Sequence, residues 1–242
     1  MNDNEKLKKA EIHTDNKALK WIENFWYHHK ASFLIVSFFV IVVIICTVQT
    51  CSKKEEDIKI AYAGPAYLSL EHSANIESVF EAVMPRDFDK NGQKDASLLL
   101  YQIYSEEQIK EIEAQTDAAG NRGFVDRNHS TNNNKNFYQY IQTGDSAICL
   151  VDASIYENLK ENDRLFEISE VLGYNCEKSA DGYGIKLGEL EIYSSYGALR
   201  QLPEDTVLCI LRPLWMGKTS KADKYECEKD MFRAIVEFKS EG

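Results

Sequence analysis

A run of 22 residues without a charged or histidine side chain, from Ala31 to Ser52, is the feature that most limits how this chain can fold. Its centre, residues 33–45, consists almost entirely of Phe, Leu, Ile and Val. A helix rises about 1.5 Å per residue, so a run of this length covers the roughly 30 Å hydrocarbon layer of a bilayer. A buried strand would be only about 4 to 8 residues long. We therefore expect a transmembrane helix at residues 31–50.

The residues around this run favour a permanent anchor over a cleaved signal peptide. A signal peptide has a short basic start and an apolar run of about 7 to 15 residues. Here 30 mostly polar residues come first and the apolar run is longer. Val48, Gln49 and Thr50 also lack the small residue expected before the modified cysteine of a lipoprotein. Trp21, Trp26 and Tyr27 precede the run, where amphipathic rings prefer the headgroup layer.

The charges on either side of the run predict its orientation. The first 30 residues carry six lysines, and positive residues near a first helix usually stay in the cytoplasm. We expect a cytoplasmic tail at 1–30, a linker at 51–57 and an extracytoplasmic domain at 58–242. Residues 31–242 hold 22 Lys and Arg against 34 Asp and Glu, a formal charge of −12. This acidity argues against nucleic acid and favours a cationic partner or a metal.

The domain alternates short apolar runs with amphipathic segments, which predicts an α/β sandwich with a mainly parallel sheet. The expected strands are 58–63, 96–104, 146–152, 184–193 and 206–211. The expected helices are 73–83, 105–115, 136–143, 154–159 and 223–238.

Particular residues set the boundaries of these elements. Ser73 is a suitable N-cap for the helix at 73–83. Ser105 and Gln108 predict a capping box, and Gly144 ends the helix at 136–143. Residues 116–135 are rich in Asn, Gly, Asp and Ser, which predicts a loop that is either mobile or functional.

The motif at residues 87–95, which we call the Asp/Asn/Gly turn, resembles the first half of a calcium-binding loop. Oxygen-bearing side chains at alternate positions, with Gly92 at the sixth, suit a calcium ion. The twelfth position is Leu98, so the usual bidentate glutamate is missing. The alternative is a turn in which Asp and Asn bond their own backbone before the strand at 96–104. The candidate ligands for a weak calcium site, the only cofactor that the sequence suggests, are Asp87, Asp89, Asn91 and Asp95.

The cysteines of the domain are widely spaced, with no C-x-x-C pair, which argues against zinc. Cys149 and Cys209 lie in apolar runs, where a free cysteine behaves as a small hydrophobic residue. Cys176 and Cys227 lie in polar surroundings and are the candidate partners for a disulfide.

Two stretches of sequence resemble known proteins. Residues 24–30 leading into the apolar run, followed by Ala63-Gly64-Pro65 and the Asp/Asn/Gly turn, resemble uncharacterised single-pass membrane proteins of clostridia and related Gram-positive bacteria. From Ile58 the domain is similar to the type 2 periplasmic-binding-protein fold of solute-binding proteins. Residues 137–151 match the helix, Gly-Asp turn and strand of that fold, and Tyr156 to Ile168 match the segment that follows. The resemblance implies one lobe of a solute-binding fold.

Open parallel sheets bind ligands at the carboxyl ends of their strands, which indicates the candidate ligand-binding residues. Gly64 would let a ligand approach the backbone, and the tyrosines could stack or donate hydrogen bonds. The aspartate and serine after the third strand could bind an amine or a hydroxyl. The alternative for each is ordinary turn chemistry. The candidates are Tyr62, Gly64, Tyr67, Asp152 and Ser154.

Catalytic signatures are weak. Gly144-Asp145-Ser146 resembles a nucleophile turn, but it precedes a strand, and only His72 and His129 lie in the domain. We therefore expect no enzyme, but a membrane-anchored module that captures a small solute or presents it to a transporter or sensor. The alternative is an interaction protein that docks a membrane or cell-envelope protein without a ligand.

Overall fold

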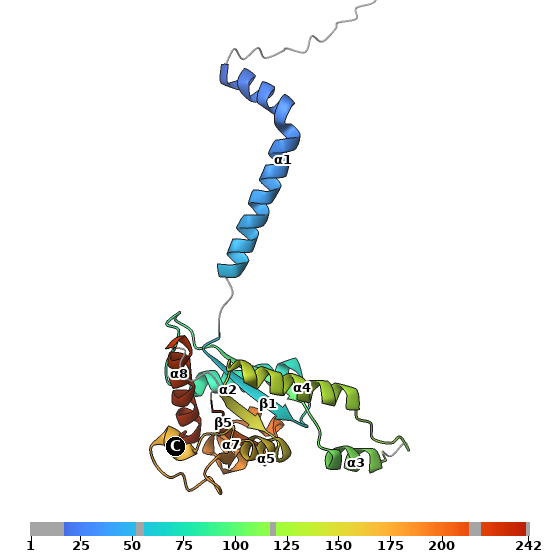
Figure 1. Ribbon diagram of the computed structural model, residues 1–242, viewed down its shortest axis with the longest axis vertical. Helices are drawn as coiled ribbons and strands as arrows, with labels where there is room; N and C mark the ends of the chain where they lie inside the picture. Colours follow the sequence, from blue (N-terminus) through green and yellow to red (C-terminus); the bar gives the residue numbers. More distant parts are fainter. Residues whose placement is uncertain (1–16, 52–55, 117–119, 213–218, 241–242) are drawn as a thin grey trace, which may run out of the picture. The chain divides into compact units, whose positions relative to one another are not determined.

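The computed structural model describes residues 17–51, 56–116, 120–212 and 219–240. It divides into two compact units, Met1–Glu55 and Glu56–Gly242 (Figure 1). Both hydrophobic cores of the protein consist of residues from the second unit. We therefore expect residues 56–242 to fold without the first unit.

The first unit contains one long helix, α1 (Lys17–Cys51). Within it, the stretch Asn24–Thr47 contains an 18-residue window with a mean hydropathy of 2.5 and is, by length and composition, long and apolar enough to cross a membrane. A signal sequence near an N-terminus can meet the same criteria of length and composition. The helix begins before residue 31, so residues 17–30 of the expected tail are helical, and residues 1–16 lie outside the described part of the chain.

The second unit is built on one five-stranded mixed sheet with the strand order β2-β1-β3-β5-β4. The strands β2 and β3 run parallel to β1, whereas β5 runs antiparallel to both β3 and β4. The α/β class is confirmed, but the sheet is mixed and not mainly parallel. The strands are β1 (Ile58–Gly64), β2 (Ala96–Gln102), β3 (Ile148–Val151), β4 (Gly184–Lys186) and β5 (Val207–Ile210).

Side chains alternate between two cores because successive residues of a strand point to opposite faces of the sheet. Ile60 and Tyr62 of β1 belong to one core, with residues of α2 (Leu70–Val83) and α8 (Thr219–Val236). Ala61 and Ala63 belong to the other core, with residues of α4 (Arg127–Thr143) and α5 (Ala153–Glu161). Helices therefore cover both faces, and Figure 1 shows α4 and α8 around the sheet.

The remaining elements are short. The chain forms α3 after β2 and α6 after α5, and the expected strand at 184–193 ends at Lys186. After Lys186, one core buries all three of Leu187, Leu190 and Ile192. In a strand, residues 187 and 190 would point to opposite faces of the sheet, so the chain does not continue as a strand here. The elements are α3 (Glu106–Ala114), α6 (Ile168–Leu172), η1 (Leu187–Glu189), α7 (Glu191–Ser195) and η2 (Gly197–Gln201).

Two predicted helix starts are wrong. The N-cap of α2 is Ser69, whose hydroxyl accepts a hydrogen bond from the His72 backbone N–H, and Ser73 lies buried inside the helix. Asp126 caps α4 and accepts a hydrogen bond from the His129 backbone N–H, so residues 127–135 are helical and not a loop.

Two other boundary predictions are confirmed. The capping box of Ser105 and Gln108 forms at the start of α3. Gly144 ends α4 at a φ of 68°, a left-handed conformation that glycine adopts without strain.

The four cysteines of the domain, Cys149, Cys176, Cys209 and Cys227, are free thiols. Cys149 and Cys209 are fully buried and directly opposite each other on β3 and β5, and burial raises the pKa of both thiols. Cys176 and Cys227 are half-buried and unpaired, so the disulfide considered from the sequence does not form in this structure.

Candidate functional site

The N-terminal ends of α3 and α5 are joined by hydrogen bonds at the carboxyl end of β3. Asp152, the N-cap of α5, accepts hydrogen bonds from the backbone N–H and the hydroxyl of Ser154, at 2.9 and 2.7 Å. Its other oxygen accepts a hydrogen bond from the Gln108 side-chain amide at 2.9 Å. The carbonyl oxygen of that amide accepts a bond from the Ser105 N–H, so the two helix caps form one network.

A cavity of 390 Å³ lies beside this network, between α3, α4 and α5, and we call it the α3–α4–α5 cavity. Ile103, Ile109 and Ile155 contribute its apolar part, and all three are at most 7% exposed. The other lining residues are polar, so a solute in the cavity would meet mainly hydroxyl, amide and charged groups. They are Tyr104, Glu106, Arg127, Ser130, Thr131, Asn134, Tyr138, Ser154 and Asn158.

The two charged groups of the cavity neutralise each other in part. The Arg127 guanidinium forms ion pairs with Glu113 at 2.9 Å and with Glu106 at 3.3 Å. The hydrogen bond from Arg127 lowers the pKa of Glu113, and the same bond raises the pKa of Arg127. These groups are exposed, so the pairs orient side chains but contribute little to stability.

Two tyrosines supply neutral hydroxyl groups. Burial raises the pKa of both Tyr104 and Tyr138, so both are protonated at neutral pH. The Tyr138 hydroxyl donates a hydrogen bond to the side-chain oxygen Oδ1 of Asn158 at 2.8 Å. The backbone N–H of Tyr104 donates to the hydroxyl of Ser130, which is 5% exposed and holds α4 against the end of β2.

Of the five residues that the sequence predicted for ligand binding, the structure places Ser154 in the wall of this cavity. Asp152 lies next to Ser154, but one of its oxygens caps α5 and the other accepts a hydrogen bond from the Gln108 side chain. Tyr67 is 78% exposed and lines none of the described cavities.

Tyr62 and Gly64 serve the fold in this structure. Tyr62 is 1% exposed, its hydroxyl accepts a hydrogen bond from the Ala66 N–H, and burial raises its pKa. A Cβ at Gly64 would lie 2.7 Å from that hydroxyl oxygen. The missing side chain at Gly64 therefore makes room for Tyr62 and does not open the backbone to a ligand.

Sequence reasoning missed the residues that α4 brings to the cavity, because residues 127–135 were expected to be a loop. Asn134 and Tyr138 are four residues apart, which places them on one side of a helix. Phe137 and Ile141 have the same spacing and are buried. The available signal that the helix begins earlier was Asp126, a residue type favoured at helix N-caps.

In the Asp/Asn/Gly turn, Asp and Asn side chains accept hydrogen bonds from nearby backbone N–H groups, as in the structural alternative to a calcium site. Asp87 accepts bonds from the backbone N–H groups of Lys90 and Gly92, and Asp89 accepts one from Asn91. Burial acts to raise the pKa of Asp87, but these hydrogen bonds outweigh it and lower the pKa. The side-chain oxygen Oδ1 of Asn91 in turn accepts a hydrogen bond from the Gln93 backbone N–H.

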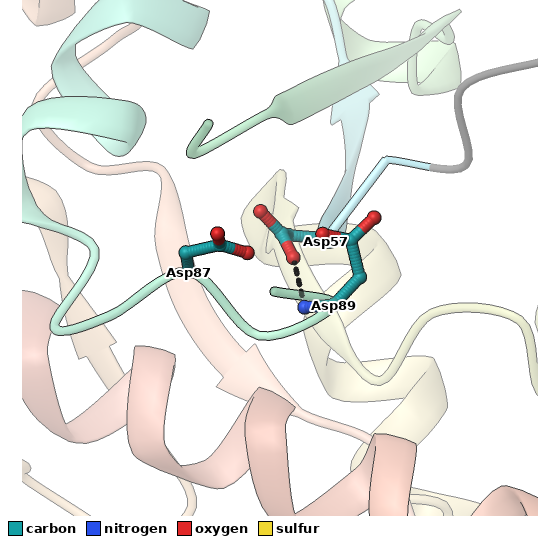
Figure 2. Close-up of side chains that lie close together, drawn as sticks. All are labelled: Asp57, Asp87 and Asp89. Atoms are coloured by element: carbon teal, nitrogen blue, oxygen red, sulfur yellow. Dashed lines mark hydrogen bonds between the residues drawn. The ribbon is translucent and has the colours of Figure 1, made fainter. Parts of the chain in front are cut away.

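Asp57, which the sequence placed in the linker, organises this turn. It is 7% exposed, and its carboxylate accepts hydrogen bonds from the N–H groups of Phe88, Asp89 and Asp95. Carboxylate oxygens of Asp57, Asp87 and Asp89 lie within 4.8 Å of one another, and Figure 2 shows the three side chains together. Of the predicted calcium ligands, Asp87 and Asp89 thus belong to this group, whereas Asp95 does not.

The three carboxylates give the calcium prediction a specific test. With a Kd of about 1 mM, as in extracellular calcium modules, 10 mM calcium would add about 1.4 kcal/mol of stability. We therefore expect the melting temperature of residues 56–242 to rise by about 3–5 °C. The rise should disappear in Asp89→Asn and persist in Asp163→Asn, a distant exposed aspartate. The absence of any rise at 10 mM calcium would leave the turn with a structural role only.

Comparison of the chain with protein-family models, with curated proteins and with solved structures found no match. The resemblance to solute-binding proteins that the sequence suggested therefore stays an expectation.

Proposed function

We propose that the chain is a single-span membrane protein whose extracytoplasmic α/β domain binds a small polar solute in the α3–α4–α5 cavity. The observation that carries the proposal is the cavity itself. Its 390 Å³ lies within the roughly 300–1,000 Å³ of small-molecule sites, and its polar groups surround a small apolar floor. The bound solute would be retained or presented to a transporter or sensor.

The position of the cavity supports this proposal. It lies beyond the carboxyl ends of β2 and β3, where open α/β sheets place their ligands. The hydrogen bonds of Asp152 and Gln108 fix the two helix ends that border it. Preorganised walls of this kind reduce the entropy lost when a ligand binds.

The long apolar helix α1 supports the membrane part of the proposal. Its span Asn24–Thr47 is sufficient for a bilayer, and the six lysines before Ala31 favour a cytoplasmic N-terminus. The resemblance to single-pass membrane proteins and to a lobe of the type 2 periplasmic-binding-protein fold is consistent with an extracytoplasmic binding domain.

We propose no chemical step. Ser146, in the turn that resembles a nucleophile motif, is 2% exposed, and its hydroxyl donates to the backbone carbonyls of Lys59 and Ile148. A hydroxyl held in this way serves β1 and β3 and is not presented to a substrate.

A thermal-shift screen of polar metabolites on residues 56–242 tests the proposal. At a concentration 100 times its Kd, a ligand should add about 2.7 kcal/mol of stability, a rise of about 5–10 °C in melting temperature. The rise should be lost in Ser154→Trp, which fills the cavity from an exposed position. Ser78→Trp, also at an exposed helix position but on α2, is the matched control and should retain it.

The interaction protein remains the second candidate because two apolar side chains near the start of α2 face solvent. Leu70 is 93% exposed and Tyr67 is 78% exposed. Large apolar groups that are exposed close together often mark protein contacts. If these residues dock a membrane or envelope protein, Leu70→Ser should abolish crosslinking to that protein and leave ligand-induced thermal shifts unchanged.

A further inference from the structure

We propose that the α3–α4–α5 cavity continues between α4 and α5 into a second cavity, and that the joined groove binds a linear oligosaccharide bearing a carboxylate. This inference rests on the proposed function, because it names the class of solute that the domain binds. The proposed binding site still includes the α3–α4–α5 cavity and extends from it along α4 and α5.

A hydrogen-bonded pair of side chains separates the two cavities. The second cavity has a volume of 350 Å³. Tyr138 and Asn158 line both cavities, and the hydrogen bond between them is 2.8 Å long. Rotation of either side chain would therefore open a continuous groove. The second cavity is lined by Tyr138, Ile141, Gln142, Asn158, Leu159, Asn162 and Arg164.

The polar residues of the groove form two rows. On α4, Asn134, Tyr138 and Gln142 follow one another at intervals of four residues. Ser154, Asn158 and Asn162 have the same interval on α5 and its C-cap. Residues four apart share one side of a helix, so each row follows the groove along its length. Similar hydroxyl and amide side chains therefore recur along the groove, which suits a linear ligand made of similar units.

Side-chain amides match the hydroxyl groups of a sugar. Each amide both donates and accepts hydrogen bonds, as each hydroxyl does. In the described part of the chain, the amides of Asn134 and Gln142 form no hydrogen bond with other protein groups. The Tyr138 ring adds an apolar surface, which suits the C–H face of a sugar ring.

Arg164 indicates that the ligand carries a negative charge. It is half-buried and lines the second cavity, and its Nε is buried without a hydrogen-bond partner among the described residues. Arg164 forms no ion pair with a described residue, so a carboxylate in the second cavity would supply the charge-assisted hydrogen bonds that its guanidinium lacks. Arg127, at the other end of the groove, is already paired with Glu106 and Glu113.

The same groove is poorly suited to a peptide or a nucleic acid. Ile141 and Leu159, its apolar residues in the second cavity, are 4% and 1% exposed, so there is little apolar surface for peptide side chains. Nucleic acids require many cations, whereas Arg127 and Arg164 are the cations that line the groove. A chain of hydroxyl groups with a carboxylate is the class that these groups fit.

The inference can be tested by calorimetry on the full chain, in a phosphocholine detergent that has no sugar headgroup. The probes are galacturonate, tetragalacturonate, maltotetraose and tetra-alanine. We expect tetragalacturonate to bind about tenfold or more tightly than galacturonate, because it is long enough to contact both cavities. Maltotetraose, which lacks the carboxylates, should bind more weakly than tetragalacturonate.

Variants of the second cavity should remove the advantage of the longer probe. Arg164→Gln and Gln142→Ala should each lower the affinity for tetragalacturonate by about threefold to tenfold or more, and Arg164→Gln should leave the affinity for maltotetraose, which has no carboxylate, unchanged. Gln139→Ala and Arg200→Gln, two exposed residues outside both cavities, are the matched controls. Equal melting temperatures of the variants without ligand would show that folding is unchanged.

Two results would overturn the inference and leave the proposed function intact. The first is equal affinity for galacturonate and tetragalacturonate, which would show that the ligand does not extend along the joined groove. The second is binding of tetra-alanine, lost in Arg164→Gln, with no binding of any saccharide. If no saccharide binds and the metabolite screen also gives no compound that depends on Ser154, both the inference and the proposed function are wrong.

Discussion

Phe137→Ala should lower the free energy of unfolding of residues 56–242 by about 3–5 kcal/mol. Phe137 has no exposed surface, belongs to the core beneath α4, and contacts the Tyr101 ring at a centroid distance of 5.6 Å. Its removal leaves a cavity under the helix that supplies Asn134 and Tyr138 to the binding site. Urea denaturation measures the loss, and the affinity of any ligand of the α3–α4–α5 cavity should fall with it.

Phe124→Ala is the matched control, since Phe124 is 84% exposed. Its effect on the free energy of unfolding should stay within about 0.5 kcal/mol. A similar loss for both variants would show that α4 does not pack on the sheet as described.

The full chain should remain in the membrane fraction after alkaline carbonate extraction, and residues 56–242 should be released completely. The reason is the apolar stretch Asn24–Thr47, whose residues belong to neither hydrophobic core of the second unit. A lysine at the centre of such a helix costs about 2.5–3.5 kcal/mol in insertion. The double variant Val40→Lys and Val43→Lys should therefore reduce membrane retention strongly.

The intact mass of the membrane-bound protein separates an anchor from a cleaved signal sequence. Retention of all 242 residues supports the anchor. A shortened protein that begins after residue 47 and is soluble would contradict the membrane part of the account. Thr131→Lys, an exposed site in the domain, controls for the added charge and should not change retention.

The elements that the sequence predicted best are those with both faces buried. The runs that became β1 and β3 are nearly continuous in apolar residues because helices cover both sides of the sheet. The direction of β5 could not be read in the same way, because a buried central strand is apolar whichever way it runs. Pairing with β3 and β4 decides it, and that is a long-range property.

Local composition misled the prediction where tertiary contacts decide the structure. Asn132, Asn133 and Asn134 are poor helix formers, yet α4 continues through them because Asp126 caps it and Phe137 anchors it. Likewise, the Asp/Asn/Gly turn was recognised, but not Asp57, which reaches it from 31 residues away in the sequence.

The candidate site was predictable only where it follows a strand. Ser154 lies three residues after the end of β3, in the first turn of α5, so the rule that ligands bind at the carboxyl ends of strands predicted it. Asn134 and Tyr138 come from a helix that precedes β3, and Asn158 lies a turn further along α5. The sequence pattern shows that these residues share helix faces, but only the packed structure shows that the faces meet at one cavity.

Nuclear magnetic resonance of residues 56–242, titrated with the most stabilising compound of the screen, tests the central claim most directly. We predict that backbone amide shifts change at 103–109, 127–138 and 154–158, the segments that line the α3–α4–α5 cavity. Changes confined to residues 62–67, or to the surface hollow lined by residues 174–178 and 236–239, would contradict it.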